Sequence, residues 1–182
     1  MVAATLPAIE RRAFPEVRAT GRRLEGYAAT FGAEARMGSF VETIEPGAFR
    51  AALAGDVLAL LDHDTGKVLG RTRSGTLRLT EDSLGLAFSL DLPDTQAGAD
   101  VLALAQRSDL GGMSFGFTVA KGGERWSGNR RSLVAVGLRE VSVVSAWPAY
   151  PDTEVALRAR QGDMVADRRR RSLVLAEAAQ WA

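Results

Sequence analysis

Ser114 and His63 are the two residues of this sequence whose side chains could form a nucleophile and base pair. Ser114 is the centre of the pentapeptide GMSFG, which matches the G-x-S-x-G pattern of serine hydrolases. A serine is a useful nucleophile only when a base takes its proton. The chain has one histidine, His63, in "LLDHDTGKVLGRT". The two residues are therefore either catalytic partners or a strand serine and a turn histidine with structural roles.

The surroundings of Ser114 exclude one large hydrolase class. In α/β-hydrolases the nucleophile lies on a sharp turn between a strand and a helix, and the triad histidine follows it in the chain. Here "FGFTVAKGG" follows Ser114 and alternates like a strand, and no histidine occurs after position 63. A triad in the order histidine, serine, acid is still possible.

The alternation of "MSFGFTV" predicts what Ser114 faces. Ser114 and Gly116 point to one side of the strand and the bulky residues between them to the other. We therefore expect Ser114 to face a surface free of large side chains, where a peptide could approach. Gly111 and Gly112 precede it, and their backbone N–H groups are candidate oxyanion donors.

His63 closes the apolar run of residues 56–63, which predicts a buried strand ending at the imidazole. A histidine held at a rigid strand end, with a pKa near neutrality, suits a general base. A lone histidine beside two aspartates in a turn is more often structural or solvated. On an extended chain, the side chains of Asp62 and Asp64 point away from His63.

Glu140 is the stronger candidate for the acid. In "LREVSVV" it shares a predicted strand face with Leu138 and Ser142, inside an otherwise apolar segment. A buried carboxylate needs a partner, because an unpaired buried charge is costly. That partner is either His63 or one of the many arginines.

Two other clusters have weaker chemical interpretations. The two carboxylates and the imidazole of "DHD" could bind a divalent cation, but consecutive strand residues converge poorly on one ion, so we expect no metal site and no cofactor. The run of four arginines at residues 168–171 could contact nucleic acid or an acidic scaffold. A solvated helix face or a disordered tail is the more common explanation of such a run.

Composition excludes further classes of function. The 182 residues include no cysteine, which excludes disulfides, thiol catalysis and thiolate metal sites, and the net charge of +1 gives no reason to expect a specific nucleic-acid partner. The first residues lack the apolar core of a signal peptide, and no apolar run approaches the length of a membrane span. We expect a cytoplasmic protein with no membrane partner.

The coarse pattern is mainly β with flanking helices, an α+β class. Strands are expected over residues 23–32, 40–44, 56–63, 113–119 and 131–146, the last as one long strand or two divided at Gly137. Several short runs between 67 and 92 are expected to form an antiparallel meander. Residues 94–109 predict the clearest helix, capped by Asp94 or Thr95, and "EPGAFRAALAG" a short one. The expected parts are an N-terminal extension (1–22), a core domain (23–157) and an Arg- and Ala-rich helix or tail (158–182).

Four motifs in order, "EPGAF", "LLDHD…LGRT", "DLGGMSFGF" and "EVSVVSAWPAYPDT", resemble the tailed-bacteriophage prohead maturation proteases. That family is similar in fold to the herpesvirus assemblins, so the resemblance implies a closed or nearly closed β-barrel. It implies a serine endopeptidase with His63 as base, Ser114 as nucleophile and Glu140 as the acid that orients the imidazole.

The resemblance also implies a substrate and a place of action. The family cuts the scaffolding segment from the major capsid protein precursor inside the assembling procapsid, in the cytoplasm of the bacterial host, and commonly cuts itself. Self-association is a further expectation. Two other hypotheses stay open: a non-catalytic capsid-assembly or scaffold-binding module on the same fold, and a β-barrel interaction domain with no viral link.

Overall fold

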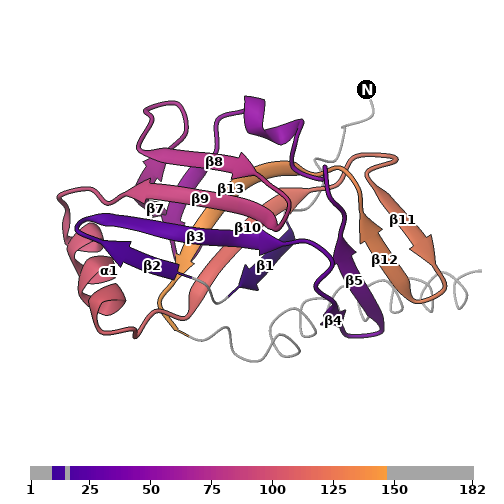
Figure 1. Cartoon of the computed structure of the whole chain (residues 1–182), viewed down its shortest axis with the longest axis horizontal. Helices are drawn as coiled ribbons and strands as arrows, with labels where there is room; N and C mark the ends of the chain where they lie inside the picture. The colour runs from indigo at the N-terminus through magenta and orange to yellow at the C-terminus, as the bar shows by residue number, and fades with distance from the viewer. Residues whose placement is uncertain (1–9, 15–16, 147–182) are drawn as a thin grey trace, which may run out of the picture.

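A computed structural model of the chain describes residues 10–14 and 17–146. The described strands, β1 to β13, form three sheets, accompanied by one α-helix and one short 3-10 helix. Two sheets pack against each other, α1 lies at one end of them and the third sheet at the other (Figure 1). The prediction of a mainly β fold is confirmed.

The first sheet holds Ser114 and Glu140 in its strands and His63 in the turn between two of them. Its strand order is β1-β10-β13-β6-β7. Its strands are β1 (Glu10–Phe14), β10 (Gly112–Thr118), β13 (Gly137–Val144), β6 (Leu58–Leu61) and β7 (Asp64–Arg71). β13 and β6 run parallel, while the other neighbours are antiparallel. Because parallel strands end at the same edge of a sheet, the turn after β6 lies beside the end of β13.

The other two sheets have four strands each. The second, in the order β2-β3-β9-β8, contains Val17–Thr20, Arg23–Thr30, Gly85–Asp91 and Leu77–Glu81. The third, in the order β11-β12-β5-β4, contains Glu124–Ser127, Arg130–Leu133, Phe40–Ile44 and Ala35–Met37. Strand pairing does not continue from one sheet to the next among these strands, so the closed barrel is not found in the described part of the chain.

The expected meander is also divided between sheets. β7 pairs with β6 in the first sheet, whereas β8 pairs with β9 in the second. The turn between β7 and β8 therefore carries the chain from one layer to the other. β1 and β2, from the predicted N-terminal extension, pair with β10 and β3. The proposed division of the chain at residues 22 and 157 stays a prediction.

Helix α1 (Gln96–Gln106) falls within the predicted span, and the Thr95 hydroxyl caps it by accepting from the Gly98 amide at 3.3 Å. The short helix expected in "EPGAFRAALAG" is a series of turns followed by a 3-10 helix, Ala52–Ala54. The terminal helix expected at 158–182 lies outside the described residues. No helix in the described part of the chain has the length and apolar character needed to cross a membrane.

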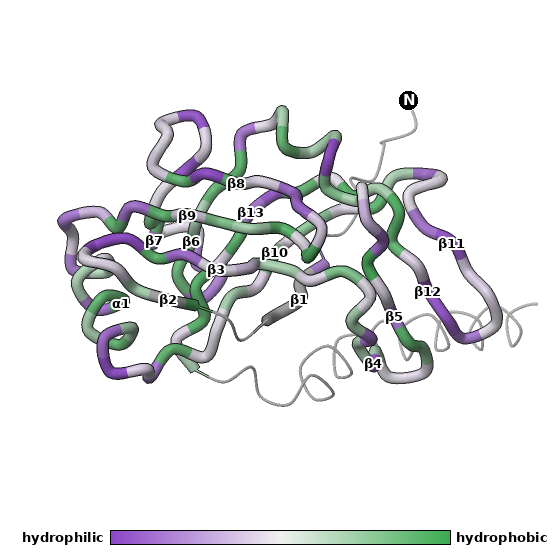
Figure 2. Tube along the Cα trace, viewed as in Figure 1, coloured by the Kyte–Doolittle hydropathy of each residue, from purple (hydrophilic) through white to green (hydrophobic). Residues whose placement is uncertain are grey.

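The core lies between the first two sheets and fixes the orientation of β10. Met113, Phe115 and Phe117 are fully buried and belong to one apolar cluster with residues of the second sheet. The Phe115 ring stands edge-on to Phe49, with centroids 5.4 Å apart, and stacks with Phe117 at 5.0 Å. Apolar segments run through these central strands, while the tip of the β11–β12 hairpin is hydrophilic (Figure 2). With these rings in the core, Ser114 and Gly116 must face the opposite side.

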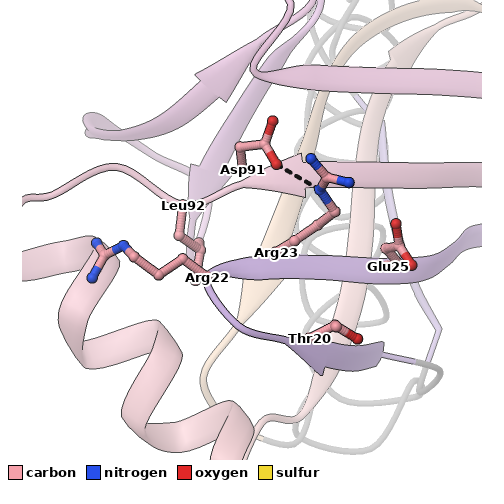
Figure 3. Close-up of a pocket in the computed structure, with 6 residues that line it drawn as sticks. All are labelled: Thr20, Arg22, Arg23, Glu25, Asp91 and Leu92. Atoms are coloured by element: carbon pink, nitrogen blue, oxygen red, sulfur yellow. Dashed lines mark hydrogen bonds and ion pairs between the residues drawn. The ribbon is translucent and has the colours of Figure 1, made fainter.

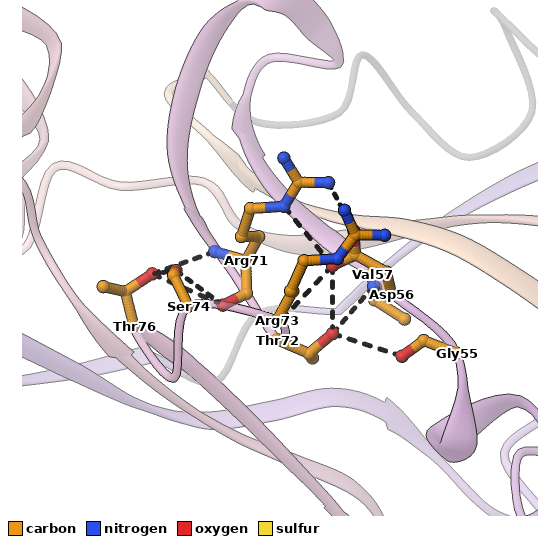
Figure 4. A network of polar contacts seen from close by, with 8 residues as sticks. All are labelled: Gly55, Asp56, Val57, Arg71, Thr72, Arg73, Ser74 and Thr76. Carbon is orange, nitrogen blue, oxygen red and sulfur yellow. Dashed lines mark hydrogen bonds and ion pairs between the residues drawn. The ribbon is translucent and has the colours of Figure 1, made fainter.

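A polar network fixes the open end of the β6–β7 hairpin (Figure 4). The Asp56 carboxylate forms an ion pair with Arg71 and accepts from the Arg73 amide at 3.2 Å. The Thr72 hydroxyl accepts from the Val57 amide at 2.9 Å. The hydrogen bond from Arg71 holds the pKa of the Asp56 carboxyl below its usual value. The network thus joins the start of β6 to the end of β7.

The Asp56 network should contribute to the stability of the fold in a pH-dependent way. A depressed carboxyl pKa contributes stability above the ordinary value of about 4, and this is lost as the pH falls through the folded-state pKa. Urea unfolding of the wild type should show a lower free energy at about pH 3 than at about pH 6, and Asp56→Asn should reduce that difference. Asp100→Asn, at an exposed carboxylate that contacts Gln96, is the control and should leave it unchanged. An equal pH dependence in Asp56→Asn and the wild type would contradict this assignment.

Candidate active site

His63 lies at the tip of the β6–β7 hairpin. β6 ends at Leu61, so the prediction that the strand continues to His63 is wrong. Asp62 and His63 form the two-residue turn, with φ angles of 51° and 60°. Two-residue hairpins favour turns with positive φ at both central positions, because this twist matches the strands, and they usually place asparagine, aspartate or glycine there. His63 therefore occupies a backbone conformation that is unfavourable for most residues.

The His63 imidazole contacts the Glu140 carboxylate, with Nδ1 2.8 Å from Oε1. The Glu140 side chain is 7% exposed and that of His63 24%. Because an ionised carboxylate can only accept, the proton of this bond belongs to Nδ1, and Nε2 of the neutral ring keeps a free lone pair. The imidazole is thus a partner for the buried Glu140 carboxylate, and an arginine is not needed to explain why this side chain is buried.

Ser142 is a second partner of Glu140. Its hydroxyl is fully buried and donates to Oε2 at 2.5 Å. The two oxygens of the carboxylate thus each accept a hydrogen bond, one from the imidazole and one from the serine. The sequence predicts that Ser142 lies on the same face as Glu140, but it does not predict that the hydroxyl binds the carboxylate. The spacing of two residues along one strand is the sequence feature that could have indicated this contact.

A β-bulge directs Glu140 away from the core. In the β10–β13 pairing, Phe117 is opposite Leu138 but Gly116 is opposite Glu140, so Arg139 is an extra residue. Leu138 belongs to the core cluster, so the prediction that it shares the face of Glu140 is wrong, and the extra residue is the reason.

Gly116 makes room for the carboxylate. A Cβ atom added at Gly116 would lie 2.3 Å from Glu140 Oε1, the oxygen that accepts from His63. The carboxylate therefore lies directly over β10, and only glycine leaves the space for it. This position is two residues from Ser114 on the same strand face.

Ser114 lies opposite Ser142 in the strand register. Directly opposed residues have Cβ atoms about 4.5–5.5 Å apart, so Ser114 is next to the residue that holds Glu140. The expectation of an accessible serine is wrong for this conformation, since Ser114 is 2% exposed. The amide of Gly111, one proposed oxyanion donor, is occupied by the carbonyl oxygen of Val144 at 2.9 Å.

The aspartates beside His63 turn in different directions. The Asp62 carboxylate contacts Ser145, and that of Asp64 contacts the Gly66 amide and Lys67. Neither carboxylate is oriented as a partner of the imidazole, and this agrees with the expectation that both point away from His63. No group of three or more possible metal ligands gathers within residues 10–14 and 17–146.

A surface hollow on the second sheet is separate from these residues (Figure 3). It is lined by Thr20, Arg22, Arg23, Glu25, Asp91 and Leu92. Its charged groups are already paired: Arg23 Nε is 2.6 Å from Asp91, and Arg22 donates to the carbonyl oxygen of Pro93 at 2.5 Å. Since none of its lining residues belongs to β6, β10 or β13, it is not part of the candidate active site.

A serine, an imidazole and a carboxylate form the residue set of a serine hydrolase. Comparison with family models makes the class specific: the model of the caudovirus prohead serine protease matches residues 9–168, most of the chain. The chain belongs to this family of phage capsid maturation proteases. No curated protein and no solved structure matches it. The relation in fold to the herpesvirus assemblins therefore stays a prediction.

The backbone of His63 yields a test that is independent of catalysis. A non-glycine residue in the left-handed region costs about 1 kcal/mol or more. His63→Gly and His63→Ala both remove the imidazole, but only glycine relieves the positive φ. We expect His63→Gly to be the more stable of the two by about 1 kcal/mol, as measured by urea unfolding at neutral pH. Equal stabilities, or a more stable alanine variant, would show that the turn has a different conformation.

Proposed function

We propose that this protein is a serine endopeptidase that cleaves the scaffolding segment of the major capsid protein precursor, and itself, during procapsid maturation. Ser114 is the nucleophile, His63 the general base and Glu140 the acid that orients it. The observation that carries the proposal is the His63–Glu140 hydrogen bond, formed directly over the strand that holds Ser114. The family match supports a serine endopeptidase, and all three residues lie within the matched span.

The proposed reaction is acyl transfer. Nε2 of His63 takes the proton of the Ser114 hydroxyl as Oγ attacks the scissile carbonyl carbon, which gives a tetrahedral intermediate. The imidazolium then donates this proton to the leaving amine, and the acyl-enzyme forms. A water molecule, activated by the same nitrogen, releases the acid and restores the serine. Throughout, the Glu140 carboxylate stabilises the positive ring through Nδ1, and Ser142 keeps the carboxylate in place.

The proposed setting follows from the family and agrees with the site. The partners are the capsid precursor with its scaffolding segment and, for self-cleavage, other copies of this chain. The place of action is the interior of the assembling procapsid in the host cytoplasm. The reaction as written uses no metal or cofactor. The burial of Ser114 fits an enzyme whose site must open to admit a peptide.

Co-expression with the capsid precursor tests the proposal. We expect Ser114→Ala and His63→Ala each to reduce cleavage by at least about a thousandfold, since each removes a reacting group. Glu140→Gln should reduce it less, by about a hundredfold, because the base is still present but poorly oriented. The cleaved fraction is measured by gel and intact mass. Ser132→Ala, in the third sheet, is the control and should process normally.

Normal processing by Ser114→Ala would exclude this mechanism. A covalent serine-directed phosphonate separates the remaining possibilities. Labelling of Ser114 in the wild type supports the protease, whereas binding of the precursor without labelling or cleavage would identify a non-catalytic assembly module.

A further inference from the structure

The hairpin tip that carries His63 is tied to the end of β13 by the preceding residue, Asp62. Its carboxylate accepts from the Ser145 amide at 2.8 Å through Oδ1 and from the Ser145 hydroxyl at 2.6 Å through Oδ2. The Asp62 amide donates to the Val143 carbonyl oxygen at 2.9 Å. Three hydrogen bonds thus join one turn residue to Val143 of β13 and to Ser145, which follows the last residue of that strand.

This connection opposes the tendency of the turn to relax. Asp62 and His63 both have positive φ angles, 51° and 60°. Aspartate tolerates this conformation, whereas it costs His63 free energy that an unrestrained turn would relieve. Strained residues persist where the surrounding structure holds them, and they concentrate at functional sites. A turn that relaxed would carry the imidazole away from Glu140, because the ring belongs to His63, the residue with the unfavourable φ angle.

We propose that Asp62 and Ser145 form a positioning clamp for the base, and this inference rests on the proposed function of the site. Glu140 lies in β13 and Ser145 directly follows its last residue, so the clamp and the His63–Glu140 bond hold the turn to the same strand at two places. Asp62 does not contact the reacting atoms. It acts by keeping Nε2 of His63 at a fixed distance from Ser114.

Asp64, on the other side of His63, shows why the clamp is specific. It is also an aspartate, but its carboxylate contacts Gly66 at 2.8 Å and Lys67 at 3.6 Å, both within β7. These local contacts do not connect the turn to β13. Asp64 is therefore a matched control, with the same charge at the same sequence distance from the base.

The test measures the rate at which a serine-directed phosphonate labels Ser114 in the full chain, followed by intact mass. Asp62→Gly removes both acceptors and tolerates the positive φ, and should slow labelling by about tenfold to a hundredfold, as expected when a catalytic group is displaced. Ser145→Ala keeps the backbone hydrogen bond and should slow it by about threefold. Asp64→Ala should stay within about twofold of the wild type. Thermal unfolding confirms that each variant is folded under the assay conditions.

Ring-nitrogen NMR of His63, the one histidine of the chain, provides a second readout that does not need catalysis. In Asp62→Gly the Nδ1 proton should exchange with water faster than in the wild type, because the ring leaves Glu140 more often. Unchanged labelling and unchanged exchange in folded Asp62→Gly would overturn the clamp, as would equal slowing in Asp64→Ala. A wild type that resists labelling would count against the proposed protease, while the NMR result would still decide the clamp.

Discussion

The hydrogen bond between the His63 imidazole and the Glu140 carboxylate is the contact on which the candidate site depends. It joins the tip of one hairpin to a buried residue of the neighbouring parallel strand, so the imidazole and the carboxylate are held in one arrangement. A buried carboxylate is costly without partners, and Ser142 satisfies its second oxygen. Gly116 then leaves the space over β10 that the carboxylate fills. The first sheet thus brings three distant segments of the chain to one place.

The site combines a rigid support with a strained element. Aromatic packing of Phe115 against Phe49 fixes β10, and the Asp56 network fixes the open end of the β6–β7 hairpin. The turn at the other end of that hairpin is in a conformation that few side chains favour. Because strain of this kind lowers stability, it persists where the structure compensates for it. The rigid sheet supplies that compensation through contacts at both ends of the hairpin.

Residue alternation accounts for most of what the sequence predicts correctly. A strand period of two places Ser114 and Phe115 on opposite faces, and the structure confirms the rings in the core. The bulge at Arg139 was not predictable, because an extra residue is defined only by the register of the partner strand. The division of β7 and β8 between sheets depends on tertiary packing for the same reason. Nor does a local signal identify the positive φ of His63, since positive φ is uncommon for every residue type except glycine.

The burial of Ser114 means that a peptide can reach its hydroxyl only after local movement. A crystal structure of the protein with a phosphonate covalently bound to Ser114 would capture that opened state. In that structure we expect Nε2 of His63 within about 3.2 Å of the serine oxygen or the adduct, with Nδ1 still hydrogen-bonded to Glu140. An imidazole turned away from the adduct, or an adduct formed on another serine, would contradict it.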